Sequence, residues 1–116
     1  MLQWAVGVFA IGAVGGLVLA SSVLRARLPS WGLSLLHAAL GATGLVLTAL
    51  VVFGDSAAPK GASIALLLLV IAALGGFYLA SHHLRQRPGP KTVVVIHASV
   101  AAIGFLLLAN AAFGVV

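Results

Sequence analysis

The chain has 116 residues, of which 63% are hydrophobic and 6% are charged, and it contains no cysteine. This composition is too apolar for a soluble domain of this length, and the lack of cysteine excludes disulfides, thiolate metal sites and thiol redox relays. The net charge of +5 comes from cations placed between apolar runs, so we expect a lipid bilayer, and no nucleic acid, as the partner.

Four segments contain no Asp, Glu, Lys or Arg, and they cover residues 2–24, 31–53, 62–84 and 92–116. A helix needs about 20 apolar residues to cross a hydrocarbon layer of ~30 Å. We therefore predict an all-α membrane protein, a four-transmembrane-helix bundle in a single domain over residues 1–116. The first segment lacks a positive n-region and is too long for a signal peptide, so it is predicted to be retained.

The cations follow alternate segments. Those after the first and third segments are Arg25, Arg27, Arg85, Arg87 and Lys91, whereas the middle loop carries Lys60 and the single acidic residue, Asp55. Short cytoplasmic loops are enriched in Lys and Arg. We therefore expect a multi-pass protein of the cell inner (plasma) membrane, with the basic loops in the cytoplasm and both termini outside.

The sequence contains an internal repeat. Residues 1–56 align with residues 61–116 without a gap, and 19 of the 56 pairs are identical. The identical pairs include His37 with His97 and the Gly–Gly pairs at 15–16 and 75–76. Each copy holds an even number of spans, so the sequence predicts two parallel repeats of a helical hairpin, related by an axis along the membrane normal. In an up-down bundle, the second and fourth helices then lie on a diagonal.

The two histidines of the repeat lie inside apolar segments, roughly 10 Å below the predicted cytoplasmic boundary. Helical spacing puts small residues on the same faces, and the Gly–Gly pairs of the first and third helices fall near the same depth. Two imidazoles facing each other beside small residues indicate haem b, with His37 and His97 as metal ligands and cations near the propionates. The remaining candidate cofactor-binding residues are Gly15, Gly16, Gly41, Gly44, Gly75, Gly76, Gly104, Arg25 and Arg85.

Other interpretations of these residues stay open. Glycines in membrane helices commonly serve close helix packing, and a membrane histidine can bind a neighbouring carbonyl or take part in a proton relay. His82 and His83 correspond to Ser22 and Val23 in the first copy, so the repeat gives them no paired role. We interpret them as interfacial residues, with a surface metal site or a proton acceptor near a quinone as the alternative.

A four-helix membrane bundle with histidines on its second and fourth helices resembles the core of membrane b-type cytochromes. That family typically carries a second histidine further along each ligating helix, where this chain has Leu50 or Val51 and Asn110 or Ala111. The resemblance therefore implies one haem between helices 2 and 4, and electron transfer near the cytoplasmic side. It implies a quinone, a redox partner protein or a second copy of the chain as partner.

Two other functions compete with a cytochrome. One is a small transporter or channel, although the four-span multidrug exporters that this chain matches in size use a glutamate within the membrane, and this chain has none there. The other is a structural subunit of a larger membrane complex with no cofactor. The sequence leaves open whether the chain is an enzyme, and the spectrum of the purified protein separates these functions.

Overall fold

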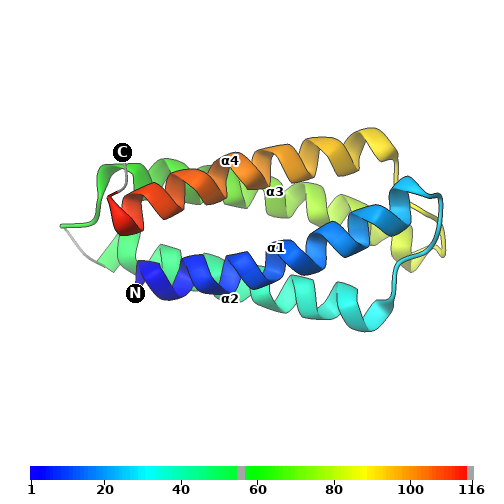
Figure 1. Ribbon diagram of the computed structural model, residues 1–116, viewed down its shortest axis with the longest axis horizontal. Coiled ribbons are helices and arrows are strands. Elements are labelled where there is room, and N and C mark those ends of the chain that lie inside the picture. Colours follow the sequence, from blue (N-terminus) through cyan, green and yellow to red (C-terminus); the bar gives the residue numbers. More distant parts are fainter. Residues whose placement is uncertain (55–56, 115–116) are drawn as a thin grey trace.

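The computed structural model describes residues 1–54 and 57–114, which form an all-helical bundle. Its helices are α1 (Leu2–Leu24), α2 (Trp31–Gly54), α3 (Lys60–Leu84) and α4 (Lys91–Phe113). They run along one axis of a molecule of 45 × 22 × 19 Å, and α1 begins at the end of the bundle where α4 finishes (Figure 1). The prediction of four helices in an all-α fold is confirmed.

The helix bounds depart from the prediction by more than one residue at two places, and α2 ends and α4 begins one residue outside the predicted segments. Helix α3 begins at Lys60, two residues early, because Pro59 caps it with a fixed φ of −58° and accepts the Ala62 N–H at 3.0 Å. Helix α4 ends at Phe113 because Gly114 turns left-handed, with φ of 62°, and donates its N–H to Asn110. The predicted segment was therefore too long, and its residues 115–116 lie outside the described residues.

The two turns that carry the arginines have the same backbone. Ala26 and Gln86, which are 60 residues apart, both adopt positive φ, at 56° and 58°. The next N–H in each turn closes back onto the helix, from Arg27 to Ser22 O at 2.9 Å and from Arg87 to His82 O at 3.0 Å. Both hairpins therefore turn in the same way, and α1 and α3 return antiparallel as α2 and α4.

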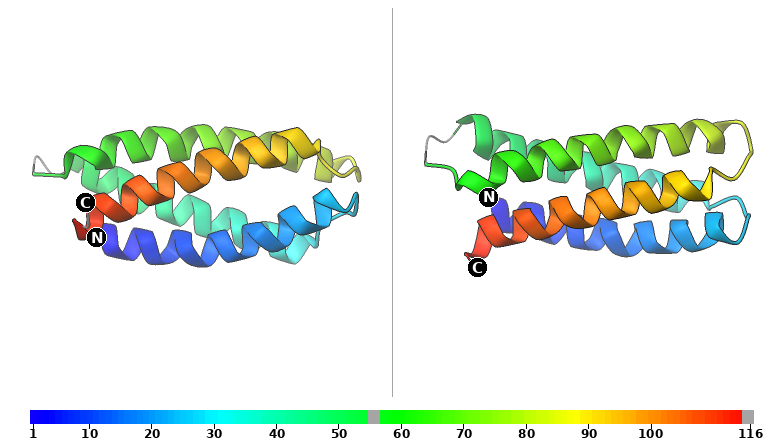
Figure 2. Two further views of the ribbon diagram at one scale, coloured as in Figure 1. Left: turned by 45° about the horizontal axis from the view of Figure 1, so that its top comes forward. Right: turned by 90° about the horizontal axis from the view of Figure 1, so that it is seen from above.

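The helices form a square with two diagonals. The hairpin partners, α1 with α2 and α3 with α4, pack most closely, α1 with α4 less closely, and α2 with α3 least. Within the described residues no close backbone approach joins α1 to α3 or α2 to α4, and the views in Figure 2 agree. The second and fourth helices are thus on a diagonal, as predicted.

The buried core occupies the half of the bundle that holds the termini. It consists of Leu2, Ala5, Ala62, Ala65, Leu69 and Leu108. Large apolar side chains such as Leu17, Phe77 and Leu106 point outward from the helices and are exposed. All four helices are long and apolar enough to span a membrane by length and composition. The other half of the bundle contains the histidines.

A buried glycine in α2 makes room for a phenyl ring of α1. A Cβ on Gly44 would lie 2.6 Å from Cζ of Phe9, whereas a Cβ on Gly41 meets nothing within 4 Å. We expect Gly44→Ala to lower the free energy of unfolding by about 1–3 kcal/mol through overpacking. The matched change Gly41→Ala should leave it unchanged or raise it slightly, because alanine has the higher helix propensity.

Reversible unfolding of the purified variants in mixed micelles measures both values. Adding Phe9→Leu to Gly44→Ala should recover most of the loss, since the ring that causes the clash is gone. A Gly44→Ala protein as stable as the Gly41→Ala protein would show that α1 and α2 do not meet through Phe9.

Candidate functional site

Two imidazoles meet inside the bundle, one from each helix of the α2–α4 diagonal. His37 and His97 are both half-buried, and their ring centres lie 6.3 Å apart with an interplanar angle of 80°. No other ring pair in the described residues joins helices that lie on a diagonal. The structure thus brings together the two histidines that the sequence pairs.

Each ring is held by a backbone carbonyl of the preceding helix. Nδ1 of His37 lies 2.8 Å from the Gly12 oxygen in α1, and Nδ1 of His97 lies 2.7 Å from the Ala72 oxygen in α3. A carbonyl oxygen only accepts hydrogen bonds, so Nδ1 carries the hydrogen in both rings. In a neutral imidazole, Nε2 then keeps its lone pair, which is the state that binds a metal.

The Nε2 atoms make no hydrogen bond with the described residues, and no buried side-chain nitrogen or oxygen there lacks a partner. Neither Nε2 is therefore sealed inside the protein. Each imidazole is oriented by its Nδ1 bond, and its Nε2 lies beside a glycine of the neighbouring helix. For His37 this atom is 3.6 Å from a Cβ placed on Gly16, and for His97 it is 3.9 Å from one placed on Gly76.

The Gly–Gly pairs of α1 and α3 give these rings their room. A Cβ on Gly16 would lie 2.8 Å from Cε1 of His37, and a Cβ on Gly76 would lie 3.3 Å from Cε1 of His97. Gly75 is looser, since its Cβ would lie 3.5 Å from the His97 Cβ. Glycine is required most strictly at Gly16, because there any side chain would push the imidazole out of place.

The separation of the rings matches that of two ligands on one metal ion. A transition metal binds an imidazole nitrogen at about 2 Å, and the nitrogen lies roughly 1 Å from the ring centre, so two such ligands hold their ring centres about 6 Å apart. The observed 6.3 Å fits this value. Within the described residues no group of three or more His, Cys, Asp or Glu could complete a protein-only site.

Other candidate glycines lie away from the imidazoles. Gly15 faces Leu33 at 3.5 Å, Gly44 faces the Phe9 ring, and Gly104 faces the Leu69 side chain at 3.0 Å. Gly41 has open space beside it. The surroundings of Gly15, Gly44 and Gly104 are helix-packing contacts, so a cofactor role for them stays a prediction.

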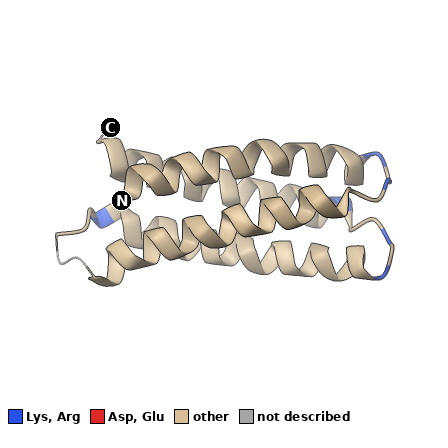
Figure 3. Ribbon diagram, turned by 90° about the horizontal axis from the view of Figure 1, so that it is seen from below, with Lys and Arg blue, Asp and Glu red and all other residues tan. Residues whose placement is uncertain are grey.

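The candidate arginines lie in the exposed turns at the histidine end of the bundle. Arg25 donates to the Ser21 carbonyl at 3.0 Å and to the Ser21 hydroxyl at 3.3 Å, both on its own helix, and Arg85 is exposed. Figure 3 shows the cations gathered in the two turns at this end, with Lys60 at the opposite end. No contact joins either arginine to an imidazole among the described residues, so their role toward propionates also stays a prediction.

Sequence analysis missed the role of His83. We expected His82 and His83 alike to be interfacial, but His83 is 7% exposed, stacks on Trp31 with ring centres 3.7 Å apart, and lies 3.2 Å from the Ser34 hydroxyl. His82 instead turns to the Tyr78 carbonyl of its own helix at 3.1 Å. The signal was the difference between the repeats, which replace His83 and Ser34 by Val23 and Val94 at the equivalent positions.

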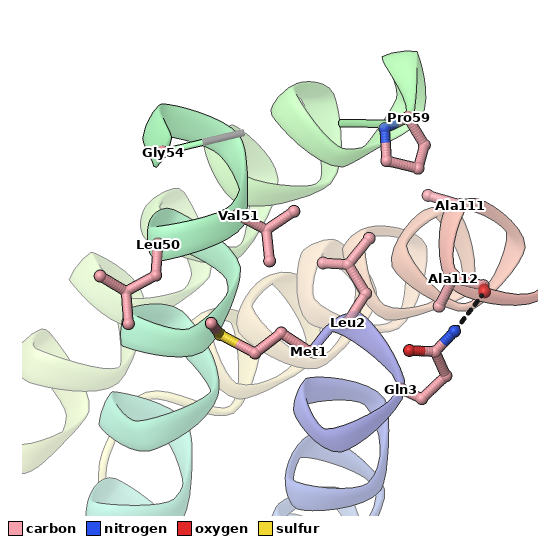
Figure 4. A pocket seen from close by; sticks show the side chains of 9 residues that line it. All are labelled: Met1, Leu2, Gln3, Leu50, Val51, Gly54, Pro59, Ala111 and Ala112. Atoms are coloured by element: carbon pink, nitrogen blue, oxygen red, sulfur yellow. Dashed lines mark hydrogen bonds between the residues drawn. The ribbon is translucent and has the colours of Figure 1, made fainter. Parts of the chain in front are cut away.

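A cavity lies at the other end of the bundle. It has a volume of about 420 Å³ and is lined from α1, α2, α4 and Pro59 (Figure 4). Leu50, Val51 and Ala111 line it, at positions where membrane b-type cytochromes typically carry a second histidine on each ligating helix. Its polar side chain, Gln3, donates to the Ala112 carbonyl at 3.1 Å. The described residues that line it include no histidine.

The chain matches no protein-family model, no curated protein and no solved structure. Its function therefore has to be argued from the two imidazoles, the carbonyls that orient them and the glycines beside them.

Proposed function

We propose that this chain is a small membrane b-type cytochrome, which binds one haem b between α2 and α4 and transfers electrons near its basic end. The single observation that carries the proposal is the pairing of His37 and His97, with ring centres 6.3 Å apart and both Nδ1 atoms on backbone carbonyls. The haem supplies a one-electron iron centre. His37 and His97 would hold it through their imidazole nitrogens.

The donor set favours haem over a bare metal ion. A structural zinc site takes four protein ligands and a catalytic one takes three, but only two imidazoles converge here, and no third donor of the described residues joins them. Iron in a porphyrin already has four ring nitrogens and needs only two axial ligands. Two histidines therefore complete a haem site and leave a zinc site incomplete.

Each part of the site has a physical task in this proposal. The Gly12 and Ala72 carbonyls fix the tautomer and direction of the imidazoles, and Gly16 and Gly76 leave the rings in place. With both histidines bound to the iron, no position on it would be left open to oxygen. The site therefore favours simple electron transfer over oxygen activation.

The proposal places the bundle in the inner (plasma) membrane with its basic turns in the cytoplasm. The length and apolar character of all four helices support it, as do the exposed leucine, valine and phenylalanine side chains on their outer surfaces. The gathering of cations at one end supports the orientation (Figure 3).

Single cysteines test this orientation cleanly, because the natural chain has none. In intact bacterial cells whose outer membrane has been made permeable, we expect Ala57→Cys, in the α2–α3 loop, to react with a membrane-impermeant maleimide. Ser30→Cys, in the α1–α2 loop, should react only after the inner membrane is broken. The reverse pattern would contradict the orientation, and labelling of both in intact cells would contradict the membrane location.

The visible spectrum of protein purified from haem-sufficient cells tests the cofactor. We expect a red preparation whose Soret band shifts and sharpens on reduction, with about one haem per chain. A colourless, folded preparation would overturn the proposal and favour a structural subunit without a cofactor.

A further inference from the structure

Each of the two turns at the basic end presents a pair of arginines in the same way. The pairs stand at the ends of residues 25–27 and 85–87, and the central residue of each segment has a positive φ, of 56° and 58°. All four arginines are exposed, and each pair begins directly after the last residue of α1 or α3. Both copies of the repeat therefore carry the same cationic turn.

The positive charge of these turns has no counter-charge among the described residues. The single acidic residue of the chain, Asp55, lies between α2 and α3 in the sequence and outside the described residues. Of the four arginines, only Arg25 makes a side-chain hydrogen bond in the described part of the chain. The guanidinium groups of the other three are therefore available to an anion that comes from outside the protein.

The backbone of each turn fixes the position of its second arginine. The N–H of Arg27 bonds to the Ser22 oxygen at 2.9 Å, and the N–H of Arg87 bonds to the His82 oxygen at 3.0 Å. An arginine in the last turn of a helix can be explained by the helix dipole, and Arg25 acts in this way through the Ser21 carbonyl. Arg27 and Arg87 follow the helix end and make no such side-chain contact among the described residues, so the dipole does not explain them.

An apolar side chain precedes each pair of arginines. Leu24 and Leu84 are 43% and 73% exposed, and they end helices that are long and apolar enough to span a membrane. When a bilayer surrounds such helices, the first residues beyond their ends lie at the level of the lipid headgroups. A ligand that matches both neighbours has an anionic head for the arginines and an apolar chain for the leucine.

We propose that each turn binds the phosphate of one anionic phospholipid, so that the chain carries two such lipids at its basic end. The phosphate accepts hydrogen bonds from Arg27 in the first turn and from Arg87 in the second. The acyl chains lie along the apolar surface that includes Leu24 or Leu84. This inference rests on the membrane location in the proposed function and not on the haem.

The two turns differ by one charge. Lys91 follows the second turn, where the first copy of the repeat has Trp31 at the equivalent position. A further cation near an anionic headgroup should strengthen binding about fivefold. We therefore expect the second turn to hold its lipid about fivefold more tightly than the first.

Native mass spectrometry of the full chain in a non-ionic detergent tests the two sites. The probe is dioleoyl phosphatidylglycerol, which is anionic, and the comparison is dioleoyl phosphatidylcholine, which has the same acyl chains and no net charge. We expect two phosphatidylglycerol molecules per chain, each bound at least about tenfold more tightly than phosphatidylcholine. Glycerol 3-phosphate, which has the anionic group without acyl chains, should displace neither lipid.

Single substitutions assign each lipid to its turn. Arg87→Gln should weaken the tighter site about fivefold and Arg27→Gln the weaker site by the same factor, because each removes one cation. Arg27→Lys keeps the charge and should bind within about twofold of the unsubstituted chain. The matched control is Lys60→Gln, which removes a cation at the opposite end of the bundle (Figure 3) and should change neither Kd.

The outcomes separate this inference from the proposed function. Equal binding of the two phospholipids, unchanged Kd values in both Arg→Gln variants, or displacement by glycerol 3-phosphate would each overturn the lipid sites, whatever the haem content of the chain. A colourless chain that still binds two phosphatidylglycerol molecules would overturn the cytochrome and support the lipid sites.

Discussion

His37→Ala and His97→Ala should each abolish stable haem binding, because in the proposed function either change removes one of the two residues that would hold the iron. Changes to groups that merely orient a ligand already cost 10–100-fold in affinity, so loss of the ligand should cost at least about a hundredfold. Haem titration of the purified variants, followed at the Soret band, measures the effect. The double variant should bind no more weakly than the weaker single one within error, because the two residues act as a unit.

The matched control is His82→Ala, which removes an imidazole bound to its own helix through Tyr78 O. It should retain the haem. Exogenous imidazole should restore a low-spin spectrum to His97→Gly, which shows that the variant is folded and lacks only the ligand. Normal haem content in either single alanine variant would contradict ligation by that residue.

Gly16→Leu should have the second-largest effect, and its cause is purely steric. Even a Cβ at this position would lie 2.8 Å from Cε1 of His37, a distance that forces the ring to move. The displaced ring loses its bond to the Gly12 carbonyl and its alignment with His97. We expect haem affinity to fall by at least about a hundredfold, measured by the same titration.

Alanine substitutions provide a graded series around the same rings. Gly16→Ala should weaken haem binding more than Gly76→Ala, because the corresponding contact at Gly76 is 3.3 Å. Gly41→Ala, with open space beside it, should have no effect. Equal haem affinity across all three would show that the glycines serve helix packing alone.

The helices could be predicted from the sequence because each is encoded by a long, continuous apolar segment. The charge-free segments 2–24 and 31–53 match α1 and α2 to within one residue. Apolar runs long enough to cross a bilayer favour a helix, because backbone polar groups in lipid must be paired internally. The diagonal pairing of α2 and α4 followed from the repeat. The end of α4 was missed because Gly114 was read as part of an apolar run and not as a left-handed cap.

The details of the site depended on tertiary contacts that no residue pattern encodes. The His37 ring finds its partner in the carbonyl of Gly12, and a carbonyl has no side-chain signature. The neighbours that Gly44 and Gly104 meet, Phe9 and Leu69, depend on the relative rotation of the helices.

The sequence of α3 alone likewise does not indicate that His83 is buried. Its neighbour Ser34 is 49 residues away, and only the contrast with Val23 and Val94, at the equivalent positions of α1 and α4, indicates that the two polar residues belong together. The sequence indicates this contact only when residue pairs on two neighbouring helices are compared between the repeats, because a comparison of single positions treats His83 and Ser34 separately.

Electron paramagnetic resonance of the ferric protein, with haem and protein counted in the same sample, tests most directly whether residues 37 and 97 of one chain share one iron. We expect a low-spin signal of bis-imidazole type at one haem per chain, replaced by a high-spin signal wherever His97→Ala retains any haem. A high-spin signal in the unsubstituted protein, one haem per two chains, or no haem at all would contradict the account.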